Sequence, residues 1–234
     1  MIFRQLFEPE SSTYTYLLGC PESGQALLID PVLETAERDL DAVRALGLTL
    51  AWTVETHVHA DHVTAAARLR SLSGCRIAYP AGEEIEGADA YLGELAPLGL
   101  GALTLRALFT PGHTDTHHCY LVGERLFSGD TLLIDGCGRT DFQGGDSAAL
   151  YRSVRDKLFA LPEDTLVYPA HDYQGRRVST IGQERGRNAR LGDGKSEAEF
   201  AAIMAALDLP YPKKIDLAVP ANRRCGAPPV QPAT

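Results

Sequence analysis

Short apolar runs alternate with polar segments along this chain and predict strands and helices in mixed order. Residues 13–18 and 25–29 have the length and composition of strands, with a turn at 21–24 between them. In residues 35–46 the apolar side chains recur at helical spacing, and Gly47 follows as a stop signal. We therefore expect a strand pair followed by an amphipathic helix.

The rest of the chain continues this alternation. A helix is predicted over 63–72, closed by Ser73 and Gly74, then a strand at 76–79, a loop-rich stretch over 80–101 and a helix over 146–158 capped by Asp146 and Ser147. After His171 the pattern becomes helical and then irregular, and the proline-rich residues 227–234 are expected to fray. The interpretation is two sheets with helices outside, forming one main domain over 1–175 and a C-terminal helical or irregular extension over 176–234 that packs on the same core.

Four apolar runs end directly in histidine or aspartate. These runs lead into Thr56-His57-Val58-His59-Ala60-Asp61-His62, Gly112-His113, Gly129-Asp130 and Ala170-His171, which together hold 5 of the 7 histidines. Strands that end in ligand-type residues bring reactive groups from a rigid sheet to one place, with those groups on loops. The pattern predicts a metal site.

The spacing within these breaks fits metal binding. His57 and His59 stand two residues apart, so one loop can turn both imidazoles the same way, while Asp61 and His62 either bind a second metal or support the ligands of the first. A glycine before His113 and before Asp130 allows a positive φ and a close backbone approach. A single histidine at a strand end is more often a hydrogen-bonded structural residue, and we assign His117 and His118 to structural or supporting positions.

Composition limits the classes of function. The chain has 234 residues, 44% of them hydrophobic, which is enough for one sizeable core, and it has no apolar run long enough to span a membrane. A formal net charge of −9 argues against a nucleic-acid partner. The N-terminus is predicted to be a strand rather than a signal or transit peptide.

Five widely spaced cysteines without a CxxC pair favour a reducing cytoplasm over a disulfide framework. Among them, Cys137 is expected to be structural and Cys225 exposed and oxidisable.

The motif Thr56–His62, followed by His113, Asp130 and His171 in this order, resembles the metallo-β-lactamase superfamily. That resemblance implies an α/β (α+β) fold, an αββα sandwich with its site at the sheet edges, but it fixes no reaction. Residues 136–143, 168–173 and 215–222 resemble the persulfide dioxygenases, the ethylmalonic encephalopathy protein family. The resemblance covers nearly the whole chain, from about Phe3 to Gly226.

The persulfide dioxygenase resemblance implies one Fe(II) per chain, held by His57, His113 and Asp130. Two histidines and a carboxylate form the facial triad of non-haem iron oxygenases. Four further residues would then surround this iron or mark a vestigial second metal site: His59, Asp61, His62 and His171. The implied reaction oxidises glutathione persulfide with O₂ and water to sulfite and glutathione. No catalytic residue beyond the metal centre is implied.

Glutathione is anionic, and the resemblance points to a set of contacts for it: Arg139, Tyr173 and Arg190, with Thr114 and Asp141 close to the site. An arginine fork suits carboxylate recognition. For Arg176, Arg177 and Arg185 we favour a solvated helix face instead.

Two other functions are compatible with the residues. Glyoxalase II, a two-metal thioesterase acting on S-lactoylglutathione, shares the metal motif and a Gly-Cys-Gly-Arg segment. The 63 residues after His171 are short for its helical domain, and residues 140–143 follow the dioxygenase pattern. A metal-dependent or thiol-binding sensor on the same scaffold is the non-enzymatic alternative. A homodimer through the C-terminal part is a further hypothesis.

Overall fold

The computed structural model describes residues 1–227, which form two mixed six-stranded sheets with helices on their outer sides. In the first sheet the strands lie in sequence order: β1 (Ile2–Glu8), β2 (Thr13–Cys20), β3 (Gln25–Ile29), β4 (Thr49–Val54), β5 (Arg76–Pro80) and β6 (Ala90–Leu92). In the second sheet they lie in reverse order: β12 (Ser179–Thr180), β11 (Leu166–Pro169), β10 (Arg125–Gly129), β9 (His118–Val122), β8 (Leu103–Phe109) and β7 (Leu98–Leu100).

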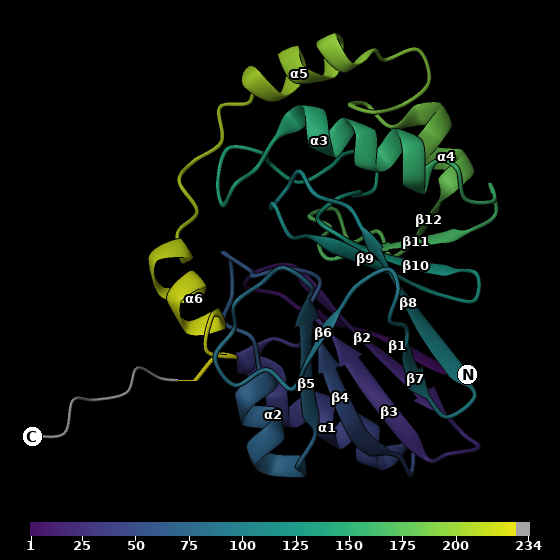
Figure 1. The fold of residues 1–234 in the computed structure, drawn as a ribbon, viewed down its shortest axis with the longest axis vertical. Coiled ribbons are helices and arrows are strands. Elements are labelled where there is room, and N and C mark those ends of the chain that lie inside the picture. Colours follow the sequence, from purple (N-terminus) through teal and green to yellow (C-terminus); the bar gives the residue numbers. More distant parts are fainter. Residues whose placement is uncertain (228–234) are drawn as a thin grey trace, which may run out of the picture.

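Helices cover the outer face of each sheet, as Figure 1 shows. On the first sheet these are α1 (Ala36–Ala45) and α2 (Ala66–Ser73). On the second they are α3 (Ser147–Arg152), a π-helix (Ser153–Leu158), α4 (Ile181–Arg187) and α5 (Glu197–Ala205). The last helix, α6 (Ile215–Asn222), lies beside the first sheet near α2. This arrangement is the αββα sandwich, which confirms the predicted fold class.

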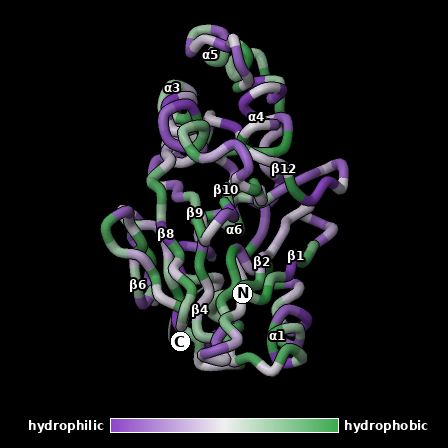
Figure 2. Tube along the Cα trace, turned by 90° about the vertical axis from the view of Figure 1, so that its right-hand side faces the viewer, coloured by the Kyte–Doolittle hydropathy of each residue, from purple (hydrophilic) through white to green (hydrophobic). Residues whose placement is uncertain are grey.

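The continuous apolar run of β3 follows from this layering. Leu27 and Ile29 belong to the core between the sheets, whereas Ala26 and Leu28 pack under α1 and α2. A strand with helices on one side and a second sheet on the other is buried on both faces, so it does not alternate between apolar and polar residues. Figure 2 shows hydrophobic stretches along the strands of both sheets.

Aromatic side chains fill the space between the sheets near β1 and β2. The Tyr16 ring lies 5.0 Å from the Phe127 ring and 5.7 Å from the Tyr168 ring, measured between centroids, so both sheets contribute to one cluster. Edge-to-face and offset aromatic pairs add to the burial of apolar area. The two sheets are thereby fixed relative to each other, and their shared edge can hold a precise site.

Most predicted elements are present, with two local differences. The side chain of Asp146 accepts a hydrogen bond from Ala149 N and caps α3 as predicted, but the second half of that helix is a π-helix. The stretch 80–101 contains β6 and β7 as well as loops. The predicted fraying concerns residues 227–234, and all of these except Ala227 lie outside the described part of the chain.

Residues beyond 175 take part in the main structure. β12 extends the second sheet next to β11, and Ile181, Phe200 and Met204 join the core beneath α3. The division at residue 175 stays a prediction, and the segment that follows it packs on the core of the preceding residues.

All five cysteines are free and buried. The prediction that Cys225 is exposed is wrong, because the turn after α6 packs onto the protein and leaves this residue 2% exposed, with its Sγ 3.4 Å from the carbonyl oxygen of Glu86. Burial raises the pKa of the Cys225 thiol to about 12. Its thiolate is therefore scarce at neutral pH. Within residues 1–227, no helix is long and apolar enough to cross a membrane.

Candidate metal centre

The histidines and aspartates that follow the four apolar runs meet at one edge of the sandwich. β8, β10 and β11 run in the same direction in the second sheet, so His113, Asp130 and His171 all follow strands that end at the same edge. The loop after β4 brings His57 and its neighbours to this edge from the first sheet. The fold therefore gathers residues that are more than 100 positions apart in sequence.

His57, His113 and Asp130 each offer a ligand atom, and these atoms all lie within 4.8 Å of one another. The Oδ1 atom of Asp130 is buried without a hydrogen-bond partner among the described residues. An orphaned buried carboxylate oxygen is costly unless a cation or donor meets it. Two imidazoles and this carboxylate match the donor set of a non-haem Fe(II) site, so the residues fit the predicted metal.

Hydrogen bonds fix both imidazoles in the form that a metal requires. Thr56 Oγ1 donates to the Asp30 carboxylate at 2.9 Å, so its lone pair accepts from His57 Nδ1 at 3.0 Å. The Nδ1 of His113 donates to the carbonyl oxygen of Arg139 at 2.7 Å. Both Nε2 atoms are thus left with free lone pairs. Burial, with the neighbouring His59 imidazole, also holds the pKa of His57 well below its usual range and keeps the ring neutral.

His117 supports Asp130 rather than joining the ligands. Its Nε2 accepts from the backbone N–H of Asp130 at 3.1 Å, and its Nδ1 lies 2.9 Å from Thr131 Oγ1. Its ring stacks on that of His57 with centroids 5.0 Å apart. His118 instead contacts the Thr116 carbonyl oxygen and the Phe109 ring, away from the ligand cluster.

A second group of potential ligands adjoins the first. His59, Asp61 and His62 offer atoms within 4.8 Å of one another, and the Nε2 of His171 lies 3.6 Å from Asp61 and 3.7 Å from Asp130. Two nitrogen atoms of this group, His59 Nδ1 and His62 Nε2, are buried without hydrogen-bond partners in the described chain. The geometry therefore keeps the donors for a second metal in place.

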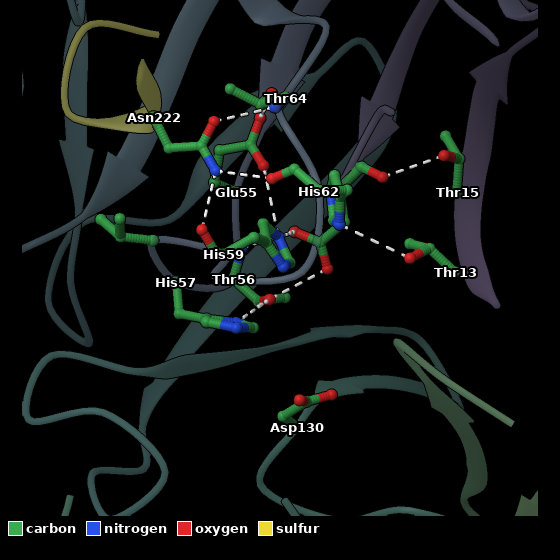
Figure 3. Close-up of polar contacts among 12 residues, drawn as sticks. Thr13, Thr15, Glu55, Thr56, His57, His59, His62, Thr64, Asp130 and Asn222 are labelled. Atoms are coloured by element: carbon green, nitrogen blue, oxygen red, sulfur yellow. Dashed lines mark hydrogen bonds and ion pairs between the residues drawn. The ribbon is translucent and has the colours of Figure 1, made fainter. Parts of the chain in front are cut away.

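Two buried acids stand behind this loop. His59 Nε2 lies 3.0 Å from Asp30 Oδ1 and 3.5 Å from Glu55 Oε2. Figure 3 shows Glu55 beside His59. Burial alone would lower the pKa of His59, but the Asp30 and Glu55 carboxylates raise it well above its usual range. Asp30 was not predicted as a site residue, although it follows the apolar β3 in the same way as the recognised ligands follow their strands.

A pocket of about 670 Å³ adjoins the group of candidate metal ligands. It is lined by His113, Asp130, Arg139, Tyr173 and Arg190 among others. Leu133, Ile134 and Leu209 form an apolar part of its wall. Of the predicted substrate contacts, Thr114 and Asp141 lie outside this lining. Thr114 is buried, and its hydroxyl has no hydrogen-bond partner among residues 1–227, while Asp141 forms an ion pair with Arg139.

The pocket arginines differ in what already neutralises them. The guanidinium of Arg139 binds both oxygens of Asp141 and donates to the Pro210 carbonyl. Arg176 binds Asp172 and Asp135 and also lines the pocket, so its predicted position on a solvated helix face is wrong. Arg190 donates to the Cys137 carbonyl at 2.7 Å and has no carboxylate partner within residues 1–227. It is the pocket arginine best placed to receive an anion.

Arg185 and Arg177 lie elsewhere. Arg185 lies on α4 and pairs with Glu163 outside the pocket. Arg177 is exposed but lies between β11 and β12, outside any helix, so its predicted position on a helix face is wrong. Cys137 is 3% exposed, with its Sγ against the Met204 sulfur and its pKa raised by burial to about 11. A buried thiol with a raised pKa is a poor nucleophile at neutral pH.

Gly129 provides a test of how closely the side chains around the metal ligands are packed. Its φ is +51°, and a Cβ there would lie 2.4 Å from His117 Nε2 and 2.8 Å from Thr56 Oγ1. We expect Gly129→Ala to lower the free energy of unfolding of the metal-free protein by about 2 to 5 kcal/mol, from left-handed strain plus overpacking. Denaturant unfolding measures this difference.

Gly123 is the matched control, since its φ is +59° but a Cβ would meet no atom within 4 Å. Gly123→Ala should lower the free energy of unfolding only by the conformational cost, about 1 to 2 kcal/mol. Equal losses in the two variants would show that the packing around Gly129 contributes nothing.

Comparison with known proteins agrees with this architecture. Residues 9–171 match the family model of the metallo-beta-lactamase superfamily. The chain is 50% identical to the mitochondrial persulfide dioxygenase ETHE1 of Homo sapiens over 233 residues, covering 97% of this chain and 89% of that protein. The crystal structure of ETHE1 from Myxococcus xanthus superposes with a TM-score of 0.95 at 51% identity, covering 97% of this chain and all of that one.

A hydroxyacylglutathione hydrolase of Polaromonas sp. is more distant. It is 39% identical over 167 residues, which cover 68% of this chain and 62% of the hydrolase. The similarity to the hydrolase thus spans a smaller part of both proteins than the similarity to the human dioxygenase.

Proposed function

This chain belongs to the persulfide dioxygenase family of the metallo-beta-lactamase superfamily, and we propose that it oxidises glutathione persulfide with O₂ and water to sulfite and glutathione at one Fe(II) per chain. The observation that supports the proposal is the cluster of His57, His113 and Asp130, two of which, His113 and Asp130, line an arginine-containing pocket. The persulfide supplies the electrons that O₂ accepts, so the reaction needs no nicotinamide or flavin.

In this proposal His57 and His113 would hold the iron through Nε2, and Asp130 would hold it through its carboxylate. Fe(II), when bound, would supply the redox chemistry that joins a sulfur donor and O₂. The carbonyl of Arg139 and the hydroxyl of Thr56 orient the two imidazoles, and His117 orients the backbone of Asp130. The chain thus contributes a preformed donor set whose side chains need little rearrangement when the metal binds.

The pocket suits a peptide-like anion with a sulfur end. Arg190 offers uncommitted donors to a substrate carboxylate, while Arg139 holds the Pro210 segment of the wall. Tyr173 stacks on His171, with ring centroids 6.1 Å apart and an interplanar angle of 7°, and its exposed side chain lines the pocket. Leu133, Ile134 and Leu209 present apolar surface to the rest of the ligand. The lining thus combines this apolar surface with several charged side chains, which can fix the orientation of a small ligand.

Oxygen uptake tests the function directly. Protein loaded with Fe(II) and checked for one iron per chain should consume O₂ when glutathione persulfide is added, with sulfite formed in equal amount. Absence of uptake from such a sample would reject the dioxygenase. Hydrolysis of S-lactoylglutathione by a sample holding two metals per chain would instead support the thioesterase, for which the second donor group is the favouring observation.

Arg190→Ala should raise KM for glutathione persulfide on the order of tenfold while the iron content stays at the parental level, because a charge-assisted hydrogen bond contributes about 1.5 kcal/mol. Steady-state oxygen uptake measures the change. Arg185→Ala is the control, since Arg185 pairs with Glu163 away from the pocket. An unchanged KM in Arg190→Ala would remove this residue from substrate binding.

A further inference from the structure

The end of α6 reaches the metal-binding loop through one side chain, that of Asn222. Its Nδ2 donates to the carbonyl oxygens of His59 at 2.8 Å and His62 at 2.9 Å, and its Oδ1 accepts from the backbone N–H of Thr64 at 2.9 Å. Figure 3 shows this amide spanning the loop. Asn222 is 1% exposed and follows the loop by about 160 positions in sequence.

These contacts supply hydrogen-bond partners to backbone groups of the loop. The segment between β4 and α2 forms neither helix nor strand, so its backbone groups have no regular partners. Buried backbone N–H and C=O groups require hydrogen bonds. A carboxamide carries two donors and an acceptor on one planar group, which is the combination that two carbonyls and one N–H require. Asn222 therefore satisfies three backbone groups on both sides of Asp61.

Asn222 is itself held from several directions. The backbone carbonyl oxygen of Asn222 accepts a hydrogen bond from the Tyr79 hydroxyl at 3.0 Å. The turn that follows is joined to α2 by a hydrogen bond from Ala67 N to the Cys225 carbonyl oxygen at 2.8 Å. At Gly226, with φ +77°, a Cβ would lie 2.1 Å from the Thr64 carbonyl oxygen. The turn and the loop are packed backbone against backbone, so the amide has little freedom to move.

We propose that Asn222 is a positioning residue that holds the His57–Thr64 loop in its metal-binding conformation. The proposal rests on the metal site of the proposed function but not on the substrate. It makes the C-terminal helix part of the metal centre, although α6 contributes no ligand. Supporting partners of this kind affect metal affinity by holding ligands in place before the metal arrives.

Asn222→Asp is the sharpest variant because it keeps the size and the acceptor but turns an oxygen toward the carbonyls of His59 and His62. We expect the dissociation constant for Fe(II), measured by competition with a chromogenic chelator, to rise at least tenfold. Amide hydrogen exchange should quicken in the loop while β4 stays protected. We also expect kcat to fall with KM nearly unchanged, since the pocket arginines are untouched.

Tyr79→Phe is the matched control, because it removes one hydrogen bond to the backbone of Asn222, while the Ala67–Cys225 hydrogen bond and the packing of Gly226 on Thr64 still hold the amide on the loop. It should retain the parental Fe(II) affinity. Asn222→Ala, which avoids the repulsion between oxygens, provides a second test if the aspartate variant does not fold. Parental affinity in a folded Asn222 variant, or an equal loss in Tyr79→Phe, would overturn the proposal. The titration requires no persulfide, so its outcome is separate from that of the oxygen-uptake experiment.

Discussion

Replacement of His113 by alanine is expected to abolish iron binding and turnover together. In the proposed site the His113 Nε2 is one of only three protein ligands, and its Nδ1 is already committed to the Arg139 carbonyl. Loss of a group that merely supports a ligand lowers metal affinity or activity about 10- to 100-fold, so loss of a ligand should exceed about 100-fold. Iron content per chain and oxygen uptake, measured on the same preparation, test both effects.

His118→Ala controls for the removal of a buried histidine near the site. His118 is 2% exposed, but its ring contacts Phe109 and the Thr116 carbonyl instead of the ligand cluster. Iron should stay bound in this variant. Full turnover by iron-free His113→Ala protein would reject the mononuclear iron site.

Site residues that follow strand ends could be predicted from the sequence, because an apolar run and the polar residue directly after it are local features of the chain. His57, His113, Asp130 and His171 all belong to this class, and the structure brings them together at one edge. Asp30 shows the same signal after β3. It was missed because a single aspartate after an apolar run is also typical of an ordinary turn.

The supports of the site were harder to predict because they depend on contacts between distant residues. Asn222 lies in a segment that carries the family resemblance, yet nothing near it in sequence indicates an amide directed at the carbonyls of His59 and His62. Arg176 appeared to belong to a solvated helix face: its pair with Asp172 is local, but its second partner, Asp135, lies 41 positions earlier in the chain. Charge patterns along a sequence predict local pairs far better than such long-range ones.

The error on Cys225 has the same origin. A residue nine positions from the end of the chain would ordinarily be exposed. Here the turn that follows Asn222 packs against α2 and β5, and Cys225 joins a small core with Val58 and Ile77. The packing that buries Cys225 also brings the Asn222 amide onto the loop, so one long-range contact accounts for both the buried cysteine and the unpredicted asparagine.

Reconstitution with Zn(II) in place of Fe(II) is expected to reduce oxygen uptake to the background rate while the metal still binds. A site of two imidazoles and a carboxylate accepts both ions, and zinc generally binds such nitrogen and oxygen donors more tightly than ferrous iron does. Zinc has no redox chemistry, so it cannot pass electrons from a persulfide to O₂. Added Zn(II) should therefore inhibit the iron-loaded enzyme by displacement, which metal analysis and oxygen uptake can follow together.

The zinc experiment also tests the second donor group. Because His62 Nε2 and His59 Nδ1 are buried without partners in the described chain, zinc could fill this group in addition to the first. Two zinc ions in the parent and one in His62→Ala would establish that second site. If zinc-loaded parent protein hydrolyses S-lactoylglutathione and iron-loaded protein takes up no oxygen, the chain is a thioesterase. If the zinc form acts on neither S-lactoylglutathione nor glutathione persulfide while the iron form consumes oxygen, the second donor group is a remnant of the fold. The activity then requires iron.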